Sequence, residues 1–149
     1  MKIPENVLIS GRSLFKYIPH RPPVFLIDSY YGRDDDASYT GYTPVKDTLF
    51  CTGTLFSEEG IVEHAAQSVA LAAGIDAMAH GNEVVPGFVG SVNEYHFYAP
   101  VHSGDKIITG IKEIHKYTGF SVIHVKTFCN GGLVAEGELK VVTINGLKQ

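Results

Sequence analysis

The sequence predicts a single α+β domain in which one long buried helix is wrapped by a curled antiparallel sheet of five to six strands. Three features predict this fold: an apolar helix-forming stretch in the middle of the chain, four β-rich runs after it, and glycine-containing turns between those runs. The 149 residues suffice for one domain with a real core and leave no room for two, so residues 1–149 are interpreted as one domain.

The central helix is predicted to begin after Ser57 and to run to about Met78. Ser57 can cap it, and Glu58 and Glu59 stand in the first turn, where carboxylates interact favourably with the positive end of the helix dipole. The body of the helix carries Ala, Leu, Val and Ile on nearly every face, which is typical of a helix surrounded by protein.

The second half of the chain is predicted to form antiparallel hairpins. Its β-rich runs are separated by turns that each contain glycine, at 103–104, 118–119 and 130–132. The four runs cover residues 84–99, 105–116, 119–129 and 133–144.

A short helix is predicted near the start of the chain, over residues 10–17, with Ser10 as its cap. The proline cluster at 19–23 must end this helix, because each proline ring fixes φ and disfavours helical backbone before it.

A hairpin is predicted to follow the proline cluster. The apolar residues 24–27 indicate a buried strand, and residues 38–43 indicate a second strand across an exposed turn near 32–36. Residues 47–56 show no clear period and are expected to form a loop. With the helix and the later hairpins, these elements give the layout of a hot-dog fold.

The composition excludes several classes of protein. Hydrophobic residues make up 44% and charged residues 19%, with a mean hydropathy of +0.05, which fits a packed globular chain and not a disordered or fibrous one. Twelve Lys and Arg against sixteen Asp and Glu give a net charge of −4, which argues against nucleic-acid binding.

The expected environment is a reducing cytoplasm. Cys51 and Cys129 form neither a CxxC pair nor a ligand cluster. No basic-then-apolar leader opens the chain, and the apolar run 65–75 is too short to span a membrane. We therefore expect a soluble cytoplasmic protein without a membrane or nucleic-acid partner.

Motifs for the common kinds of nucleotide and hydrolase site are missing from the sequence. No GxSxG, Walker or GxGxxG segment occurs, so α/β-hydrolase chemistry, nucleotide hydrolysis and dinucleotide binding are unsupported. No HExxH or HxH spacing occurs either, so neither a metal nor a cofactor is expected.

Glu63 is the first candidate functional residue. It shares one face of the helix with Gln67, four residues later. A carboxyl group on an apolar helix is costly to leave charged and unpaired, so it could hold a proton near neutral pH and act as a general acid. The alternative is that Glu63 stays hydrated near the helix start and serves only the dipole. The pattern leaves both interpretations open.

His20 is the second candidate. It lies in the segment IPHRPP, where prolines restrict the backbone, whereas the other six histidines are scattered through a helix, turns and strands. His64 follows Glu63 directly, but neighbours on a helix lie about 100° apart and do not share a face, so it is the poorer candidate for acting with Glu63.

Four blocks of the sequence resemble the beta-hydroxyacyl-acyl carrier protein dehydratases. They are the proline-histidine segment Ile18–Asp28, the helix segment Val62–Gln67, the Pro and Gly-Asp region Phe97–Asp105 and the strand-like Gly132–Leu139. The sequence is also similar to the divergent dehydratase-like proteins of aryl-polyene and flexirubin pigment clusters, which combine an early Pro-His loop with a helix Glu-x-x-Ala-Gln.

The resemblance implies a hot-dog dimer with two active sites at the subunit interface, each using a His of one subunit and a helix Glu of the other. Glu63 matches the helix acid and Gln67 the glutamine one turn later. The catalytic His of the family lies in a His-Phe-Pro-Gly stretch about fourteen residues before the Glu. Here the corresponding residues 49–56 contain no histidine.

Dehydration of 3-hydroxyacyl thioesters, in fatty-acid-like or polyene biosynthesis, is the function we expect. Glu63 would be the acid and His20 the base, and backbone N–H groups near Gly60 or Gly90 would polarise the thioester carbonyl. The residues expected to bind substrate are Gln67, Gly60, Phe88 and Gly90.

Two alternatives stay open: a hot-dog thioesterase in which Glu63 activates water, and a non-catalytic dehydratase-like subunit or acyl-binding partner. The expected partners are acyl carrier protein or acyl-CoA as the substrate carrier, and a second subunit in a homodimer or a heterodimer with a related chain. Since the chain is acidic overall, local basic residues such as Arg21, Lys106 or Lys112 would have to contact an acidic carrier protein.

Overall fold

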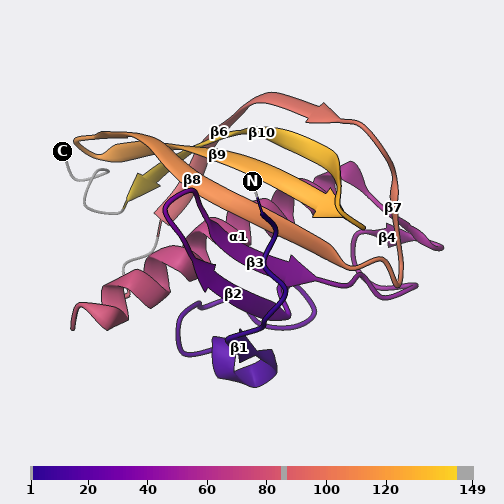
Figure 1. The fold of residues 1–149 in the computed structure, drawn as a ribbon, viewed down its shortest axis with the longest axis horizontal. Helices are drawn as coiled ribbons and strands as arrows, with labels where there is room; N and C mark the ends of the chain where they lie inside the picture. Colours follow the sequence, from indigo (N-terminus) through magenta and orange to yellow (C-terminus); the bar gives the residue numbers. More distant parts are fainter. Residues whose placement is uncertain (1, 85–86, 144–149) are drawn as a thin grey trace.

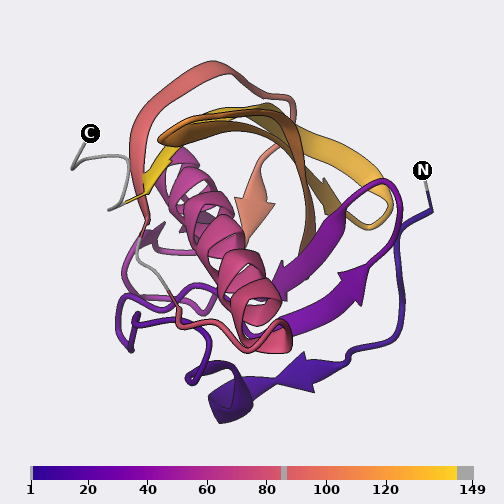
Figure 2. The same ribbon diagram turned by 90° about the vertical axis from the view of Figure 1, so that its left-hand side faces the viewer.

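The computed structural model describes residues 2–84 and 87–143. Its chain forms one long helix partly enclosed by a curled antiparallel sheet (Figure 1). Seen along the helix, the sheet arches over one side (Figure 2), and the N-terminal segment packs on the helix outside the sheet, where Leu14, Ile18 and Ile27 cluster with Leu71. The predicted α+β hot-dog architecture is confirmed. No helix within the described ranges is long and apolar enough to cross a membrane.

The helix α1 (Glu58–Ala79) has the predicted boundaries. The Ser57 side chain accepts a hydrogen bond from the Gly60 N–H at 3.1 Å, so Ser57 is the predicted cap. Ten of its residues are buried, from Gly60 to Gly74, which confirms that the apolar body lies inside the protein.

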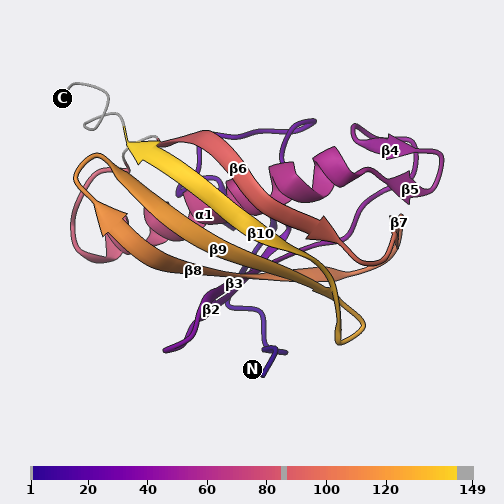
Figure 3. The same ribbon diagram turned by 90° about the horizontal axis from the view of Figure 1, so that it is seen from above.

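The four predicted β-rich runs are confirmed as strands, and they lie side by side over the helix (Figure 3). Residues 85–86 and 144, which fall within two of the predicted runs, lie outside the described residues. The strands are β6 (Gly87–Phe97), β8 (Ile107–Tyr117), β9 (Phe120–Cys129) and β10 (Gly132–Thr143).

The main sheet has more strands than the five to six expected. Its seven strands follow the order β1-β2-β3-β8-β9-β10-β6, and each neighbouring pair is antiparallel. A hairpin is present as β2 (Ser29–Arg33) and β3 (Ser38–Tyr42), so its second strand is where predicted and its first strand begins later than the predicted 24–27; β1 (Ile9–Ser10) extends the sheet beyond it.

A second, three-stranded sheet stands at the N-terminal end of α1, where only a loop was predicted. It consists of β4 (Cys51–Thr52), β5 (Leu55–Phe56) and β7 (Val101–His102). The prediction was wrong because strands of two residues show no hydrophobic period.

Two predictions for the N-terminal region need correction. The short helix at 10–17 is a 3₁₀-helix, η1 (Gly11–Leu14), and the Ser10 side chain makes no capping hydrogen bond. Residues 24–27 are not a strand, although Leu26 and Ile27 are buried. The Val24 carbonyl and both backbone groups of Leu26 bind side chains of α1 and not a neighbouring strand.

Strand β6 forms one edge of the main sheet and bends around α1. Its register against β10 contains two irregularities: Gly90 is an extra residue between the pairs Val89–Val141 and Ser91–Lys140, and Glu94 adopts a positive φ of 51° near the second. Bulges of this kind bend a strand and increase its twist.

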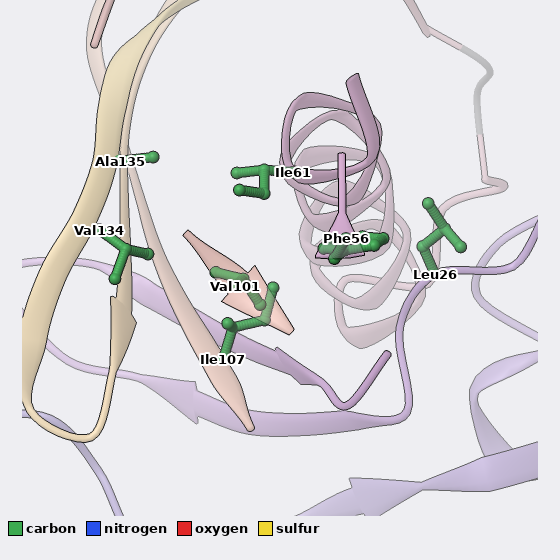
Figure 4. Packing of buried hydrophobic residues seen from close by; sticks show 7 residues of the cluster. All are labelled: Leu26, Phe56, Ile61, Val101, Ile107, Val134 and Ala135. Atoms are coloured by element: carbon green, nitrogen blue, oxygen red, sulfur yellow. The ribbon is translucent and has the colours of Figure 1, made fainter. Parts of the chain in front are cut away.

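The hydrophobic core joins the helix to both sheets (Figure 4). In one cluster Ile61 of the helix packs with Phe56 of β5 and with Ile107 of β8. Leu26 belongs to the same cluster, so the segment before β2 is part of the core although it is not part of the sheet. The full cluster is Leu26, Phe56, Ile61, Val101, Ile107, Val134 and Ala135.

Candidate active site

Glu63 and Gln67 form the centre of the candidate site. They lie one turn apart on α1, and the Gln67 side-chain amide donates to Glu63 Oε1 at 3.0 Å. Gln67 is buried and Glu63 is half-buried. One carboxylate oxygen of Glu63 is therefore bound by a buried amide, and this contact restricts the position of the Glu63 side chain.

Gln67 also binds the segment that precedes β2. Its Nε2 donates to the Val24 carbonyl at 2.7 Å, and its Oε1 accepts from the Leu26 N–H at 2.7 Å. Both amide N–H donors of Gln67 are thus in use. Its contacts within the chain connect this segment to Glu63, and its predicted contact with substrate stays a prediction.

His20 lies in the stretch 18–23, referred to here as the His20 loop. The Arg21 guanidinium donates to the carbonyls of Ile18 at 2.7 Å, of His20 itself at 2.8 Å and of Phe15 at 3.1 Å. The same guanidinium lies 4.4 Å from the centre of the Phe15 ring. These contacts confirm that the loop is held in one shape.

The imidazole of His20 has an unused hydrogen-bonding atom. Its Nδ1 is buried and has no hydrogen-bond partner among the described residues. Buried polar atoms in folded proteins are nearly always paired, so an exception at a candidate site is informative.

The His20 loop runs along the helix in the direction opposite to α1. Its later end is tied to Gln67 through Val24, and before its start the Tyr17 carbonyl lies against Gly74 of the helix. At a rise of about 1.5 Å per residue, Gly74 is roughly 16 Å along the axis from Glu63. Going back from Val24, the chain therefore leads away from Glu63.

Gly60 was expected to lie near the N–H groups that polarise the thioester carbonyl, and this role stays a prediction. Its N–H donates to Ser57 Oγ as part of the helix cap. Its lack of a side chain has a packing reason, because a Cβ here would stand 2.5 Å from the Phe56 ring and 2.8 Å from Phe50. Gly60 is thus a close-packing position at the helix start.

Phe88 and Gly90 lie on the exposed edge strand β6. Phe88 is 52% exposed, and Gly90 is the extra residue of the bulge described above. No hydrogen bond within the described residues links either of them to Glu63. Their predicted role in substrate binding stays a prediction.

His64 has a role that the sequence analysis missed. It is fully buried, with Nδ1 2.7 Å from the Leu26 carbonyl and Nε2 2.9 Å from Thr109 Oγ1 of β8. Burial lowers the pKa of His64 to about 4, against smaller opposing effects of the Leu26 hydrogen bond and of Asp28. The side chain is therefore neutral at physiological pH.

The signal for His64 was present in the sequence. His64 and Ser68 are four residues apart and share a face of α1, both are buried, and Ser68 Oγ lies 2.6 Å from Thr40 Oγ1. Polar side chains on the buried face of a helix require partners, and inward-facing threonines on the strands can supply them.

A cavity lies elsewhere in the described part of the chain. It has a volume of about 440 Å³ between the C-terminal half of α1 and the sheet, and neither Glu63 nor His20 lines it. Its lining combines apolar side chains such as Val69 and Ile111 with charged ones such as Arg33 and Asp76. Within the described ranges, no cluster of three or more His, Cys, Asp or Glu could hold a metal.

Comparison with known proteins gives a consistent result. A family model described as ApeP-like, ApeP dehydratase, matches residues 12–149. A 3-hydroxyacyl-[acyl-carrier-protein] dehydratase FabZ from Syntrophotalea carbinolica is 30% identical over 135 residues, covering 87% of this chain and 90% of the relative. A FabZ from Nitratiruptor sp. is 26% identical over 139 residues, covering 87% and 94%.

A solved structure supports the fold. The dehydratase heterocomplex ApeI:P from Xenorhabdus doucetiae contains a chain that superposes with a TM-score of 0.74 at 15% identity, covering 89% of this chain and 91% of that one. At this identity the likeness shows the hot-dog fold alone.

Proposed function

The chain belongs to the ApeP-like dehydratase family, and on this premise we propose that it eliminates water from 3-hydroxyacyl thioesters carried on acyl carrier protein, with Glu63 as general acid and His20 as general base. The carrier protein is named in the FabZ relatives, which this chain matches over most of its length. The expected setting is fatty-acid-like or polyene biosynthesis.

The proposed step transfers two protons. The His20 imidazole takes a proton from the carbon next to the thioester carbonyl, and the electron pair of that C–H bond forms the new carbon-carbon double bond. The C–O bond of the 3-hydroxyl group breaks as the Glu63 carboxyl group donates its proton, so the products are water and an enoyl thioester. Transfer of the proton from the imidazolium back to the carboxylate restores the site.

One observation carries the proposal: the amide of Gln67 binds both the carboxylate of Glu63 and the backbone of the segment that follows the His20 loop. In each chain the candidate acid and the loop with the candidate base are thus both held in place by the same buried group, whichever subunit supplies the other half of the site. The unpaired Nδ1 of His20 further supports a reacting role for this imidazole.

We assign His20 and Glu63 of one site to two different subunits. In a single chain the His20 loop leads away from Glu63 along the helix. Strand β6 is a suitable contact for the second subunit, because it is an 11-residue sheet edge with exposed apolar side chains, among them Phe88 and Val92. The second subunit is another copy of this chain or a related one.

The first test measures enoyl thioester formation from 3-hydroxyacyl carrier protein. Glu63→Gln and His20→Asn are each expected to lower the rate by about 10²–10⁴-fold, as the loss of a general acid or base does. Glu59→Gln, an exposed acid one turn earlier, and His115→Asn, an exposed strand histidine, are the matched controls and should retain activity. Full activity of Glu63→Gln would overturn the proposal.

The same assay separates the alternatives. Release of free carrier thiol without enoyl product would indicate a thioesterase. Absence of both products, with the chain alone and with a related subunit, would indicate a non-catalytic subunit.

A second test addresses the sharing of the site between subunits. Mixing Glu63→Gln with His20→Asn protein and allowing subunits to exchange should restore about a quarter of the wild-type activity, because half of the two-fold dimers are then mixed and each has one intact site. No recovery after verified exchange would place both residues in one chain.

A further inference from the structure

A chain of buried hydrogen bonds crosses the protein from the sheet to the segment 24–26. It joins Thr127 of β9 to Thr109 of β8 at 2.8 Å, Thr109 to His64 of α1 at 2.9 Å, and His64 to the Leu26 carbonyl at 2.7 Å. All three side chains are completely buried. The proposed mechanism uses none of them.

The direction of every hydrogen bond in this chain is determined. The Leu26 carbonyl can only accept, so His64 Nδ1 carries the proton and donates. The neutral ring must then accept at Nε2, so the Thr109 hydroxyl donates to it and accepts from Thr127 in turn. Three elements of the fold are thus connected by donors and acceptors that have no alternative arrangement.

His64 and Gln67 hold neighbouring groups of the same segment. His64 binds the Leu26 carbonyl, and Gln67 binds the Leu26 N–H and the Val24 carbonyl. Three backbone groups that a neighbouring strand would otherwise satisfy are therefore fixed by one helix, and Glu63 is on that helix. The stacking of the His64 ring on Tyr42, with centroids 6.0 Å apart, further limits movement of the ring.

We propose that His64 is a positioning residue for the dehydration: through the Leu26 carbonyl it fixes the segment 24–26, and with it the His20 loop, relative to α1 of its own chain, and thereby sets where His20 meets the Glu63 carboxyl group supplied by the second subunit. This inference rests on the proposed function. It assigns His64 no contact with substrate. The imidazole acts by setting where the loop lies, and a displacement of about 1 Å at a reacting group can cost about 10²-fold in rate.

The test separates the contact made by Nδ1 of the imidazole from the contact made by Nε2. An asparagine amide can occupy the place of Nδ1 and donate to the Leu26 carbonyl, whereas a glutamine amide reaches the place of Nε2 and serves only Thr109. We expect His64→Asn to retain most of the kcat and His64→Gln to lose about 10–10²-fold, with KM changed little in both. Equal loss of kcat in both variants, in proportion to their loss of thermal stability, would show a merely structural role.

Ser68→Ala is the matched control. It removes the buried hydrogen bonds of the Ser68 hydroxyl with Thr40 and with the His64 carbonyl, one turn later on the same helix, and leaves the His64 ring and residues 24–26 untouched. It should lower the melting temperature and leave kcat nearly unchanged. A fall of kcat equal to that of His64→Gln would overturn the proposal, because general loosening of the helix would then explain both.

Hydrogen exchange makes the proposal testable apart from the proposed function. The amide of Leu26 should exchange faster in His64→Gln than in wild type, and at the wild-type rate in His64→Asn and Ser68→Ala. If Glu63→Gln proves fully active, the proposed acid is wrong, and this exchange pattern still decides whether His64 fixes the segment. Unchanged exchange in His64→Gln would overturn the inference.

Discussion

Two histidines are associated with the segment 24–26: His64 binds it from α1, and His20 precedes it in the chain. Their surroundings are opposite. Both ring nitrogens of His64 are hydrogen-bonded inside the protein, whereas Nδ1 of His20 is buried without a partner among the described residues. A histidine with both nitrogens occupied has no site for a proton from a substrate, and one with an unpaired nitrogen does. Hydrogen-bond saturation thus separates the histidine that holds the structure from the candidate for chemistry.

The comparison of His64 with His20 leads to three predictions about stability. The largest effect is expected in the pH dependence of the free energy of unfolding. The pKa of His64 is about 4 in the folded protein and about 6.5 when unfolded, so below pH 6.5 the unfolded chain binds a proton that the folded chain does not. Stability from this group is fully present above pH 6.5 and is lost as the pH falls to about 4. The total loss is on the order of 3 kcal/mol.

Denaturant unfolding of wild type and His64→Asn between pH 7.5 and 3.5 measures this loss. The difference between the two curves isolates His64 from the carboxylates that titrate in the same range. Wild type should lose stability relative to the variant as the pH falls. Parallel curves would mean that His64 is accessible to protons in the folded state, and the contrast with His20 would disappear.

A smaller effect on stability is expected at the contact between Gly74 of the helix and Tyr17, the residue before the His20 loop. Gly→Ala inside a helix normally stabilises by about 1 kcal/mol. At Gly74, however, the added Cβ would overlap the Tyr17 carbonyl. Gly74→Ala is therefore expected to destabilise the protein by about 1–3 kcal/mol, and to slow dehydration by moving the loop.

Thermal unfolding and the enoyl assay check this prediction, with Ala73→Ser at the exposed neighbouring position as the control. Because the sheet side of the helix is untouched, the low-pH behaviour assigned to His64 should persist in Gly74→Ala. A stabilised and fully active variant would show that the contact with Tyr17 does not hold the loop.

The difference between local signals and contacts made by distant residues explains which parts of the fold could be predicted from the sequence. The helix boundaries follow from Ser57 and the two glutamates after it, and the hairpins from glycine turns, because these signals are local. Residues 24–27 were mistaken for a strand because their partners are side chains about 40 positions later in the chain. Only the folded arrangement reveals that a helix, and not a strand, satisfies this backbone.

The candidate site was predictable to a similar extent. The pairing of Glu63 and Gln67 on one face follows from helical spacing, and in the structure the two side chains are joined by a hydrogen bond. The fixed loop around His20 follows from its prolines and is confirmed in the contacts of Arg21. His64 was set aside because it does not share a face with Glu63, an argument that tests for a catalytic partner and overlooks a residue acting through the backbone.

The smallest effect is expected at the ion pair between Arg33 and Asp76. Its atoms are 2.6 Å apart, as close as any contact in the buried network, and it joins the end of β2 to the last turns of α1. The two side chains are 59% and 47% exposed, so water screens the attraction and competes for both partners. Their coupling should be only about 0.2–1 kcal/mol.

A double-mutant cycle with Arg33→Gln and Asp76→Asn measures this coupling at low and at high salt, and the value should fall as the salt concentration rises. The same substitutions should leave the rate of enoyl formation unchanged, since neither side chain contacts the His20 loop or Glu63 among the described residues. A coupling above about 2 kcal/mol that is independent of salt would contradict the contrast between exposed and buried contacts. Short distance, and not burial, would then decide which polar contacts stabilise this fold.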